Sequence, residues 1–490
     1  LLAGAPALAQ VTPEDVWTSW KSTAENLGQT VAFGAETRAG NVLTVTAVTL
    51  TQPTDGPDIV FEMGDMSFAD QGDGTVAITL APSFTMSVTD RPQYGEAVDA
   101  RMVMRLEGFE LVASGEPAEI TYDYGATAIS FGIERFEVDG EPFDIVVDAV
   151  LGVVEGSYSY VGGDEPALYS DVAADSLKLD VRVIAPEDEG RLVINLAIDG
   201  FESTSNIERM DLLNALEGED IGPALLEGLA IAGDIAYGPA EFGFEFEERG
   251  DRTAISGSAE SGSGLMEMSA DALAYSITGQ GTTYTMSGSE IPLPEITVSY
   301  EDLALAFALP AAASAEPQDF SLLVRLVNLV LDEGVWSMAD PGGALPHDPA
   351  TLIVDIAGRA NWTYGLFDPR TMGSDGFPGD LHALELRELV ASAAGANVTG
   401  EGAFIFDNAD RQSIPGIPRP MGEVTLTAVG LNGLMDKLVA MGLLPQDQAA
   451  SAKFMLGLFA SQVEGQEDTY TSKIELTPEG GIVANGQPLQ

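Results

Sequence analysis

Alternation of apolar and polar side chains is the feature of this sequence that most restricts its fold. Along residues 75–88, Val, Ile, Leu, Phe and Met occupy alternate positions, and the positions between them hold Thr, Ser or Ala. The same period of two recurs in residues 101–106 and 177–183. A period of two is typical of strands in antiparallel sheets that have one apolar face and one face in water. We therefore predict an α+β fold dominated by antiparallel β-sheet.

Pro82 lies in the middle of the longest alternating run. Proline cannot donate a hydrogen bond to a strand ladder, so we expect a sheet edge or a bulge at this point. A continuous strand over residues 75–88 would be roughly 45 Å long. Strands of that length predict an elongated sheet.

The chain has 490 residues, which is too long for one ordinary hydrophobic core. We predict two β-rich units, residues 10–250 and residues 251–490. Each unit is expected to end in a helix hairpin packed on its sheet, followed by one or more strands.

The C-terminal hairpin is predicted from a change of period after Gly430. Apolar residues recur at helical spacing up to Met441, Gly442 is placed to end the first helix, and Pro445 suits the start of the second. We expect these stripes to be buried on the flanking strands, and the alternative is a mobile lid or docking helix with its stripe exposed. The stripe residues in question are Leu434, Leu438, Phe454 and Leu458.

An earlier segment has a similar pattern. A strand is expected to end at Gly200, Ser205 and Glu208 are spaced as a capping box, and an apolar stripe begins at Met210. Pro223 is then placed to open a second helix. Either an internal duplication or a chance similarity explains why the two segments share this pattern.

The chain carries 77 acidic and 21 basic residues, a formal net charge of −56. Nucleic-acid binding requires clustered Lys and Arg, so the composition excludes a nucleic-acid partner. The charge is explained either by a surface that gathers cations or by solubility in a salty medium, and the second explanation requires no specific activity.

The first nine residues, LLAGAPALA, are apolar and small, and Ala7, Leu8 and Ala9 match the small-x-small pattern that precedes a signal-peptidase cut. We read residues 1–9 as the remnant of a signal peptide and Gln10 as the mature start. No later stretch is long and apolar enough to span a bilayer. The mature protein is therefore expected to be soluble and periplasmic, without an integral membrane segment.

Four stretches of the second half carry a family resemblance: PQDF (317–320), LPHDPATL (345–352), GLNGLMDKLVAMGLLP (430–445) and IVANGQPLQ (482–490). Together they resemble the uncharacterised alphaproteobacterial family catalogued as domain of unknown function 2125. The resemblance is strongest over residues 291–490, and it implies an exported protein of the Gram-negative cell envelope. It supplies no established active site for any position of this chain.

Motifs of known chemistry are missing from the sequence. His347 and His382 are its only histidines, it has no cysteine, and it contains no HExxH, GxSxG or phosphate-binding loop. We interpret His347 as a loop residue and His382 as a surface residue of a strand. Residues 407–410 contain three potential oxygen ligands, but their spacing predicts a turn rather than a calcium site. No catalytic residue, cofactor or metal ligand is assigned.

These observations favour a non-catalytic envelope protein that binds an apolar or polymeric ligand, such as a lipid or an envelope polymer, or that scaffolds a protein partner. The alternative is a carboxylate-based periplasmic hydrolase. An apolar groove would support the first function. Two facing carboxylates in a polar cleft with aromatic walls would support the second.

The charge balance predicts that salt stabilises the fold. Repulsion among the carboxylates is screened as the Debye length falls from roughly 30 Å at 0.01 M salt to about 3 Å at 1 M. We expect the melting temperature to rise across this NaCl range, as measured by calorimetry. A flat or falling melting temperature would contradict the prediction.

Overall fold

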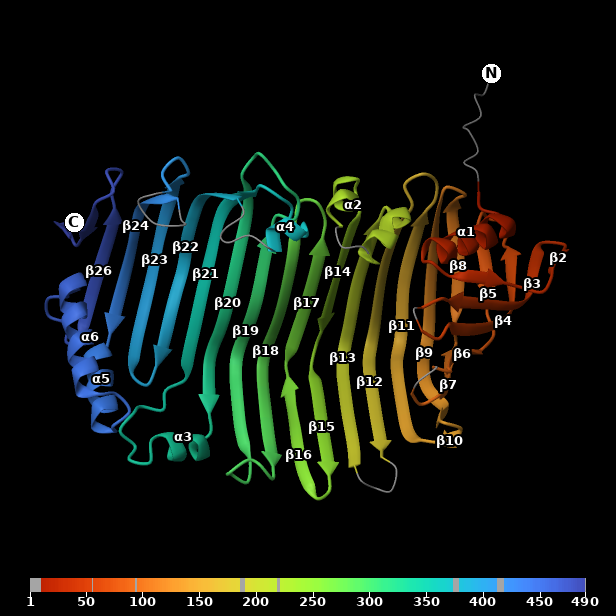
Figure 1. The fold of residues 1–490 in the computed structure, drawn as a ribbon. Coiled ribbons are helices and arrows are strands. Elements are labelled where there is room, and N and C mark those ends of the chain that lie inside the picture. The colour runs from red at the N-terminus through yellow and green to blue at the C-terminus, as the bar shows by residue number, and fades with distance from the viewer. Residues whose placement is uncertain are drawn as a thin grey trace. The chain divides into compact units, whose positions relative to one another are not determined.

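The computed structural model describes residues 10–54, 56–92, 95–185, 190–217, 221–372, 379–411 and 418–489. Antiparallel strands predominate, which confirms the predicted fold class (Figure 1). The expected signal segment, residues 1–9, lies outside the described residues. The chain divides into two compact units: unit 1 is Leu1–Leu216, Gly228–Ser261 and Ser287–Pro292, and unit 2 is Glu217–Glu227, Gly262–Met286 and Leu293–Gln490.

The hydrophobic core of unit 1 forms where helix α1 (Pro13–Asn26) packs against strands. Val16 and Trp17 of the helix share one buried cluster with Phe68 and Tyr122 of the strands. Helix α1 therefore covers one part of the sheet in unit 1. The strands that lie mainly in unit 1 are β1 (Thr30–Ala32), β2 (Glu36–Ala39), β3 (Val42–Gln52), β4 (Ile59–Asp70), β5 (Val76–Thr79), β6 (Ser83–Asp90), β7 (Val98–Glu107), β8 (Glu110–Glu116), β9 (Glu119–Val138), β10 (Glu141–Pro142), β11 (Asp144–Val161), β12 (Ala167–Ile184), β13 (Gly190–Glu208), β14 (Ala230–Tyr237), β15 (Ala240–Glu248) and β16 (Asp251–Ala259).

The run expected to form one long strand over residues 75–88 is divided at Pro82. β5 ends before the proline and pairs with β4 and β8, whereas β6 begins after it and pairs with β4 and β7. The irregularity expected at Pro82 is therefore present, and the two halves of the run form separate strands. The physical reason is that the backbone nitrogen of Pro82 carries no hydrogen and cannot donate to a strand ladder.

The strand end predicted at Gly200 is also wrong. Gly200 has a φ of 69°, but β13 pairs with β12 on both sides of it and extends to Glu208. At this glycine β13 exchanges its other neighbour, from β15 to β14. Ser205 and Glu208 lie in the ladder and form no capping box. The helical segments that follow are a 3₁₀ helix (Met210–Glu217) and α2 (Gly222–Leu226).

Unit 2 contains a meander in which each long strand pairs with the next one along the chain, from β18 to β24. β26 then pairs with β24 and β27. The short helix α3 begins directly after β20. The elements that lie mainly in unit 2 are β17 (Ser261–Met268), β18 (Leu273–Gly288), β19 (Ile296–Leu309), β20 (Gln318–Leu331), α3 (Glu333–Ala339), β21 (Ala350–Trp362), α4 (Pro369–Met372), β22 (Gly379–Ala393), β23 (Ala396–Asp407), β24 (Arg419–Val429), α5 (Leu431–Ala440), α6 (Gln446–Phe459), β25 (Ser461–Gln462), β26 (Thr469–Leu476), β27 (Ile482–Ala484) and β28 (Gln487–Pro488).

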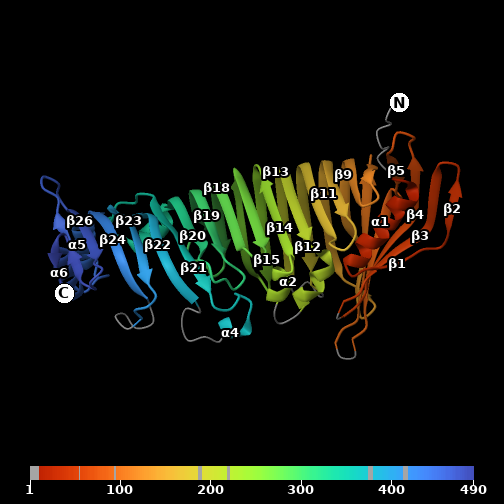
Figure 2. The same ribbon diagram turned by 90° about the horizontal axis from the view of Figure 1, so that it is seen from above.

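The two units differ in how they bury large side chains. The fully buried large residues of unit 1 include Tyr122, Phe68, Met66 and Ile120, but none of the largest ones among the described residues lies between Leu293 and Leu489. In Figure 2 the strands from β18 to β24 stand side by side as one layer. Unit 2 is therefore a sheet without a conventional core over most of its width.

Helix α5 is bounded by two glycines in the left-handed conformation. Gly430 before it has a φ of 74° and Gly442 after it has a φ of 75°, which confirms the predicted helix end. A Cβ added at Gly430 would lie 2.3 Å from the backbone oxygen of Gly395, whereas one added at Gly442 would meet no atom within 4 Å. Only the first glycine is required for close packing as well as for conformation.

The two glycines give a matched test of that packing. Each alanine substitution costs about 1–2 kcal/mol because an L-residue enters the left-handed region. Gly430→Ala adds a backbone clash, so we expect it to lower the free energy of unfolding by about 3 kcal/mol or more in total. Denaturant unfolding of Gly430→Ala and Gly442→Ala measures the difference. Equal losses would show that the contact with Gly395 is unimportant.

Candidate functional site

One face of the unit 2 sheet is built almost entirely from apolar side chains. Residues directly opposite each other in antiparallel strands point to the same face, so the register sorts the side chains into rows. Four adjacent rows on one face cross β20–β24, and three of them extend back to β18. We call this set the apolar face: Phe320, Gly358, Leu384, Phe404, Gly422 and Leu476; Tyr275, Phe307, Leu322, Ile356, Leu386, Gly402, Val424 and Ile474; Ile277, Leu305, Val324, Val354, Leu389, Gly400, Leu426 and Ser472; Gly279, Leu303, Leu326, Leu352, Ala391, Val398, Ala428 and Tyr470.

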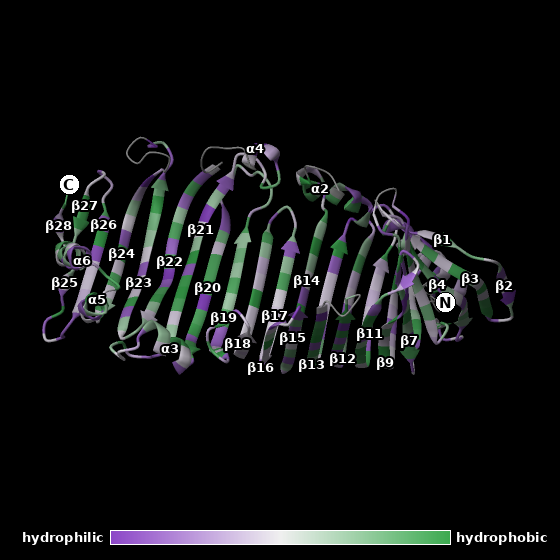
Figure 3. Cartoon of the chain, turned by 60° about the horizontal axis from the view of Figure 1, so that its bottom comes forward, coloured by the Kyte–Doolittle hydropathy of each residue, from purple (hydrophilic) through white to green (hydrophobic). Residues whose placement is uncertain are grey.

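Large side chains of the apolar face are open to solvent. Tyr275, Ile277, Leu305, Leu322 and Leu352 each expose between 40% and 43% of their surface. The alternation behind this arrangement appears in Figure 3 as bands of hydrophobic and hydrophilic colour along the strands. Soluble monomers rarely expose a contiguous apolar patch of this kind unless it binds something.

Glycines within the rows leave space that side chains of neighbouring strands occupy. An added Cβ at Gly400 would lie 2.4 Å from Cδ2 of Leu426 and 3.5 Å from Cδ2 of Leu389. An added Cβ at Gly358 would lie 2.4 Å from Cζ of Phe320. Side chains of neighbouring strands therefore lean over the glycines and fill the space above them.

The opposite face of the same strands is charged, and we call it the charged face. Arg325 lies 4.0 Å from Asp302 and 3.6 Å from Glu388, and Lys473 lies 2.8 Å from Glu423. These side chains are partly or largely exposed, so each ion pair contributes little to stability. Their effect is to give the sheet one well-hydrated side.

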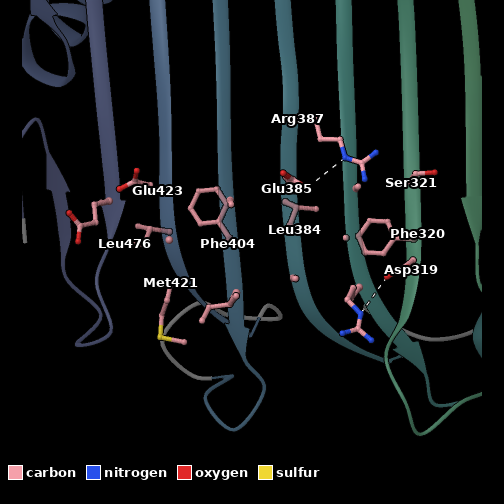
Figure 4. Close-up of a pocket in the computed structure, with 18 of the residues that line it drawn as sticks. Asp319, Phe320, Ser321, Leu384, Glu385, Arg387, Phe404, Met421, Glu423 and Leu476 are labelled. Carbon is pink, nitrogen blue, oxygen red and sulfur yellow. Dashed lines mark ion pairs between the residues drawn. The ribbon is translucent and has the colours of Figure 1, made fainter.

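A hollow of about 930 Å³ crosses β20–β24 and β26. Most of its lining residues belong to rows of the charged face, including small ones such as Ala357 and Ala403. Figure 4 shows two ion pairs there, Asp319 with Arg359 at 3.4 Å and Glu385 with Arg387 at 3.6 Å. Glu423 and Glu475 also line the hollow and lie opposite each other in the ladder of β24 and β26, but Lys473 lies 2.8 Å from Glu423. Since Asp319, Glu385 and Glu423 each have a cation as partner, the hollow gives no support to the hydrolase alternative.

His347 lies against the helix that follows β20. Its ring stacks on Trp336 with centroids 4.4 Å apart, and Nδ1 lies 3.2 Å from the carboxylate of Glu333. Asp340 is buried nearby, and its carboxylate accepts a 2.6 Å hydrogen bond from the N–H of Leu345, which lowers the pKa of Asp340. These contacts fit the expected loop role, because they tie the loop after α3 to the helix.

The remaining polar candidates also have structural partners. Nε2 of His382 lies 2.7 Å from Oδ1 of Asn361, and the side chain is half-buried rather than on the open surface. Asp407 lies 2.8 Å from Arg419, and the amide of Asn408 donates to the carbonyl of Leu381. This agrees with a turn over residues 407–410. No group of side chains suited to a metal ion occurs in the described part of the chain.

The C-terminal hairpin is present, but its expected burial is wrong for α6. Phe454 is 70% exposed and Leu458 is 50% exposed. Leu434 and Leu438 of α5 are only half-buried, and α5 has no fully buried residue. We expected the apolar stripes of both helices to be covered by a sheet. Instead, α5 and α6 pack against each other and contact the strands at few points. The alternative with an exposed stripe describes α6 better.

Two apolar hollows adjoin helix α5. One of about 410 Å³ lies between α5 and strands β20–β23, and one of about 420 Å³ lies between α5 and α6. Leu431 and Leu434 line both hollows. The first hollow also includes Leu326, Leu352 and other members of the apolar face, so it lies at the end of that face. Sequence reasoning found the helices but missed the hollows.

No helix in the described ranges is both long and apolar enough to cross a bilayer. Of the helices that the structure describes, the longest have 14 residues each. A span of the hydrocarbon core requires about 20.

Comparison with known proteins agrees with the resemblance seen in the four sequence stretches. A family model described as "Uncharacterized protein conserved in bacteria (DUF2125)" matches residues 235–484, just over half of the chain. The matched residues include the strands of the apolar face and the whole C-terminal hairpin. No curated protein and no solved structure matches the chain. The protein therefore belongs to this family of uncharacterised bacterial proteins, DUF2125.

Proposed function

We propose that the protein is an exported, non-catalytic component of the cell envelope, and that the apolar face of unit 2 binds the hydrocarbon part of a lipid. The observation that carries the proposal is the uncovered apolar face itself. Its rows keep large aliphatic and aromatic side chains in contact with water, at a cost of about 25 cal/mol per Å² of apolar surface. A bound hydrocarbon would remove that cost.

The chemistry of the rows favours hydrocarbon over a polar polymer. The apolar face consists mostly of aliphatic, aromatic and glycine residues, and its side-chain hydroxyls are those of Tyr275, Tyr470 and Ser472. The hydroxyls of Tyr470 and Ser472 already have hydrogen-bond partners in the C-terminal hairpin, Asn432 and Phe459. A polysaccharide would bury hydroxyl groups there without enough partners, which costs free energy. An acyl chain has no polar group to satisfy. The charged face would keep the sheet hydrated while the other face is occupied.

A pair of matched substitutions tests the binding face. Leu322 lies on the apolar face and Ile405 lies on the charged face, and both are exposed strand residues. We expect Leu322→Glu to weaken binding of a fluorescent fatty acid at least tenfold, because a carboxylate against hydrocarbon is desolvated. Ile405→Glu should change the affinity less than twofold.

Thermal unfolding of both variants serves as the control. Each side chain is substantially exposed, so each substitution should cost less than about 1 kcal/mol of stability. Equal weakening by both variants, or no binding by the unsubstituted protein, would contradict the proposal. Native mass spectrometry of protein purified from its own envelope should show retained lipid, whereas a retained protein partner without lipid would favour scaffolding instead.

The export part of the proposal rests on residues 1–9. We expect the protein isolated from the periplasm to begin at Gln10, because Ala7, Leu8 and Ala9 form a signal-peptidase pattern. Intact-mass measurement determines the mature start. A periplasmic form that retains residues 1–9 would refute the cleavage.

A further inference from the structure

We propose that the C-terminal hairpin, α5 and α6, is the subsite that receives the methyl end of a long alkyl chain. This inference rests on the proposed function of the apolar face and names where its ligand ends. The hollow under α5 adjoins the apolar face, and the hollow between α5 and α6 adjoins the hollow under α5. Leu431 and Leu434 form the boundary that both hollows share.

The hairpin is fixed to the sheet at its ends. The carboxylate of Asp468 accepts hydrogen bonds from the N–H groups of Asn432 at 3.1 Å and Gly433 at 2.9 Å, at the first turn of α5. At the end of α6, the carbonyl of Phe459 accepts from Oγ of Ser472 at 2.7 Å and from Nδ2 of Asn485 at 3.0 Å. The N- and C-terminal ends of the hairpin therefore both depend on polar contacts with neighbouring strands and loops.

The middle of the hairpin is packed loosely by comparison. One ion pair joins the helices, from Nζ of Lys453 to Oδ1 of Asp436 at 2.6 Å. Among the residues of α6, only Ala449 is fully buried. Anchored ends and a sparsely filled middle preserve a space between α5 and α6, and its volume lies in the range of about 300–1,000 Å³ typical of ligand pockets.

The residues that line the hollow between α5 and α6 favour a hydrocarbon ligand. Its residues are Leu, Met, Ala and Phe, including Met435, Leu438 and Met455. A peptide would have to bury N–H and C=O groups there without side-chain partners, which is costly. A lipid headgroup would meet the same penalty. A methylene chain carries no such groups, so its methyl end can enter the hollow while the polar end stays outside.

Chain length is the property that this subsite would select. A short chain is accommodated on the apolar face alone, whereas a long chain gains further burial in the hairpin. We expect the full-length protein to bind palmitate at least tenfold more tightly than decanoate. Titration calorimetry with the two fatty acids below their critical micelle concentrations measures the ratio.

Two identical substitutions on the hairpin separate its interior from its outer surface. Leu434→Trp fills the boundary of the two hollows, and Leu458→Trp adds the same side chain at a position that lines neither. We expect Leu434→Trp to remove the advantage of palmitate, so that palmitate and decanoate bind with similar affinity. Leu458→Trp should retain the advantage. A retained advantage in Leu434→Trp would overturn the inference.

A second measurement needs no substitution. Palmitate that carries a diazirine at its methyl end is bound to the full-length protein and photolysed, and the labelled peptides are identified by mass spectrometry. Labelling of residues 431–459 supports the inference, and labelling confined to strand peptides overturns it. Equal binding of both fatty acids overturns the subsite alone. Failure to bind either one overturns the proposed function as well.

Discussion

Backbone hydrogen bonding between neighbouring strands is the interaction on which unit 2 depends. Its strands from β18 to β24 pair in chain order, and β26 continues the sheet. In an ordinary domain a second layer would bury one face of such a sheet. Here the backbone ladders and the side-chain contacts within each row hold the sheet together instead of a second layer. The apolar face remains free because the sheet is held together along its plane rather than across it.

The sequence predicted much of this design because alternation reports directly which side chains share a face. The strand over residues 177–183 follows from its period alone, and helix α1 has a separate signal in the sequence. Thr12 and Asp15 cap it reciprocally, with the N–H of Asp15 donating to Oγ1 of Thr12 and the N–H of Thr12 donating to Asp15. The spacing of these two residues was visible in the sequence.

The features that escaped prediction depend on partners that period does not encode. A positive-φ glycine ends a helix or a strand in many proteins, but Gly200 lies inside a continuous ladder because β12 pairs on both sides of it. Likewise, the stripe of α6 predicts an apolar face but not what covers it. Phe454 and Leu458 are exposed, and α6 makes few contacts with the strands. The hollows beside α5 likewise depend on how the two helices pack, and no residue spacing in the sequence predicts them.

The chain-order pairing of unit 2 has a consequence for how such a protein can change over generations. Each hairpin contacts mainly the hairpins before and after it, so its stability is approximately a sum of local terms, as in repeat proteins. Adding or deleting one hairpin would lengthen or shorten the sheet and leave the other rows in register. The capacity of the apolar face could then be adjusted in steps of two strands, without redesign of a central core.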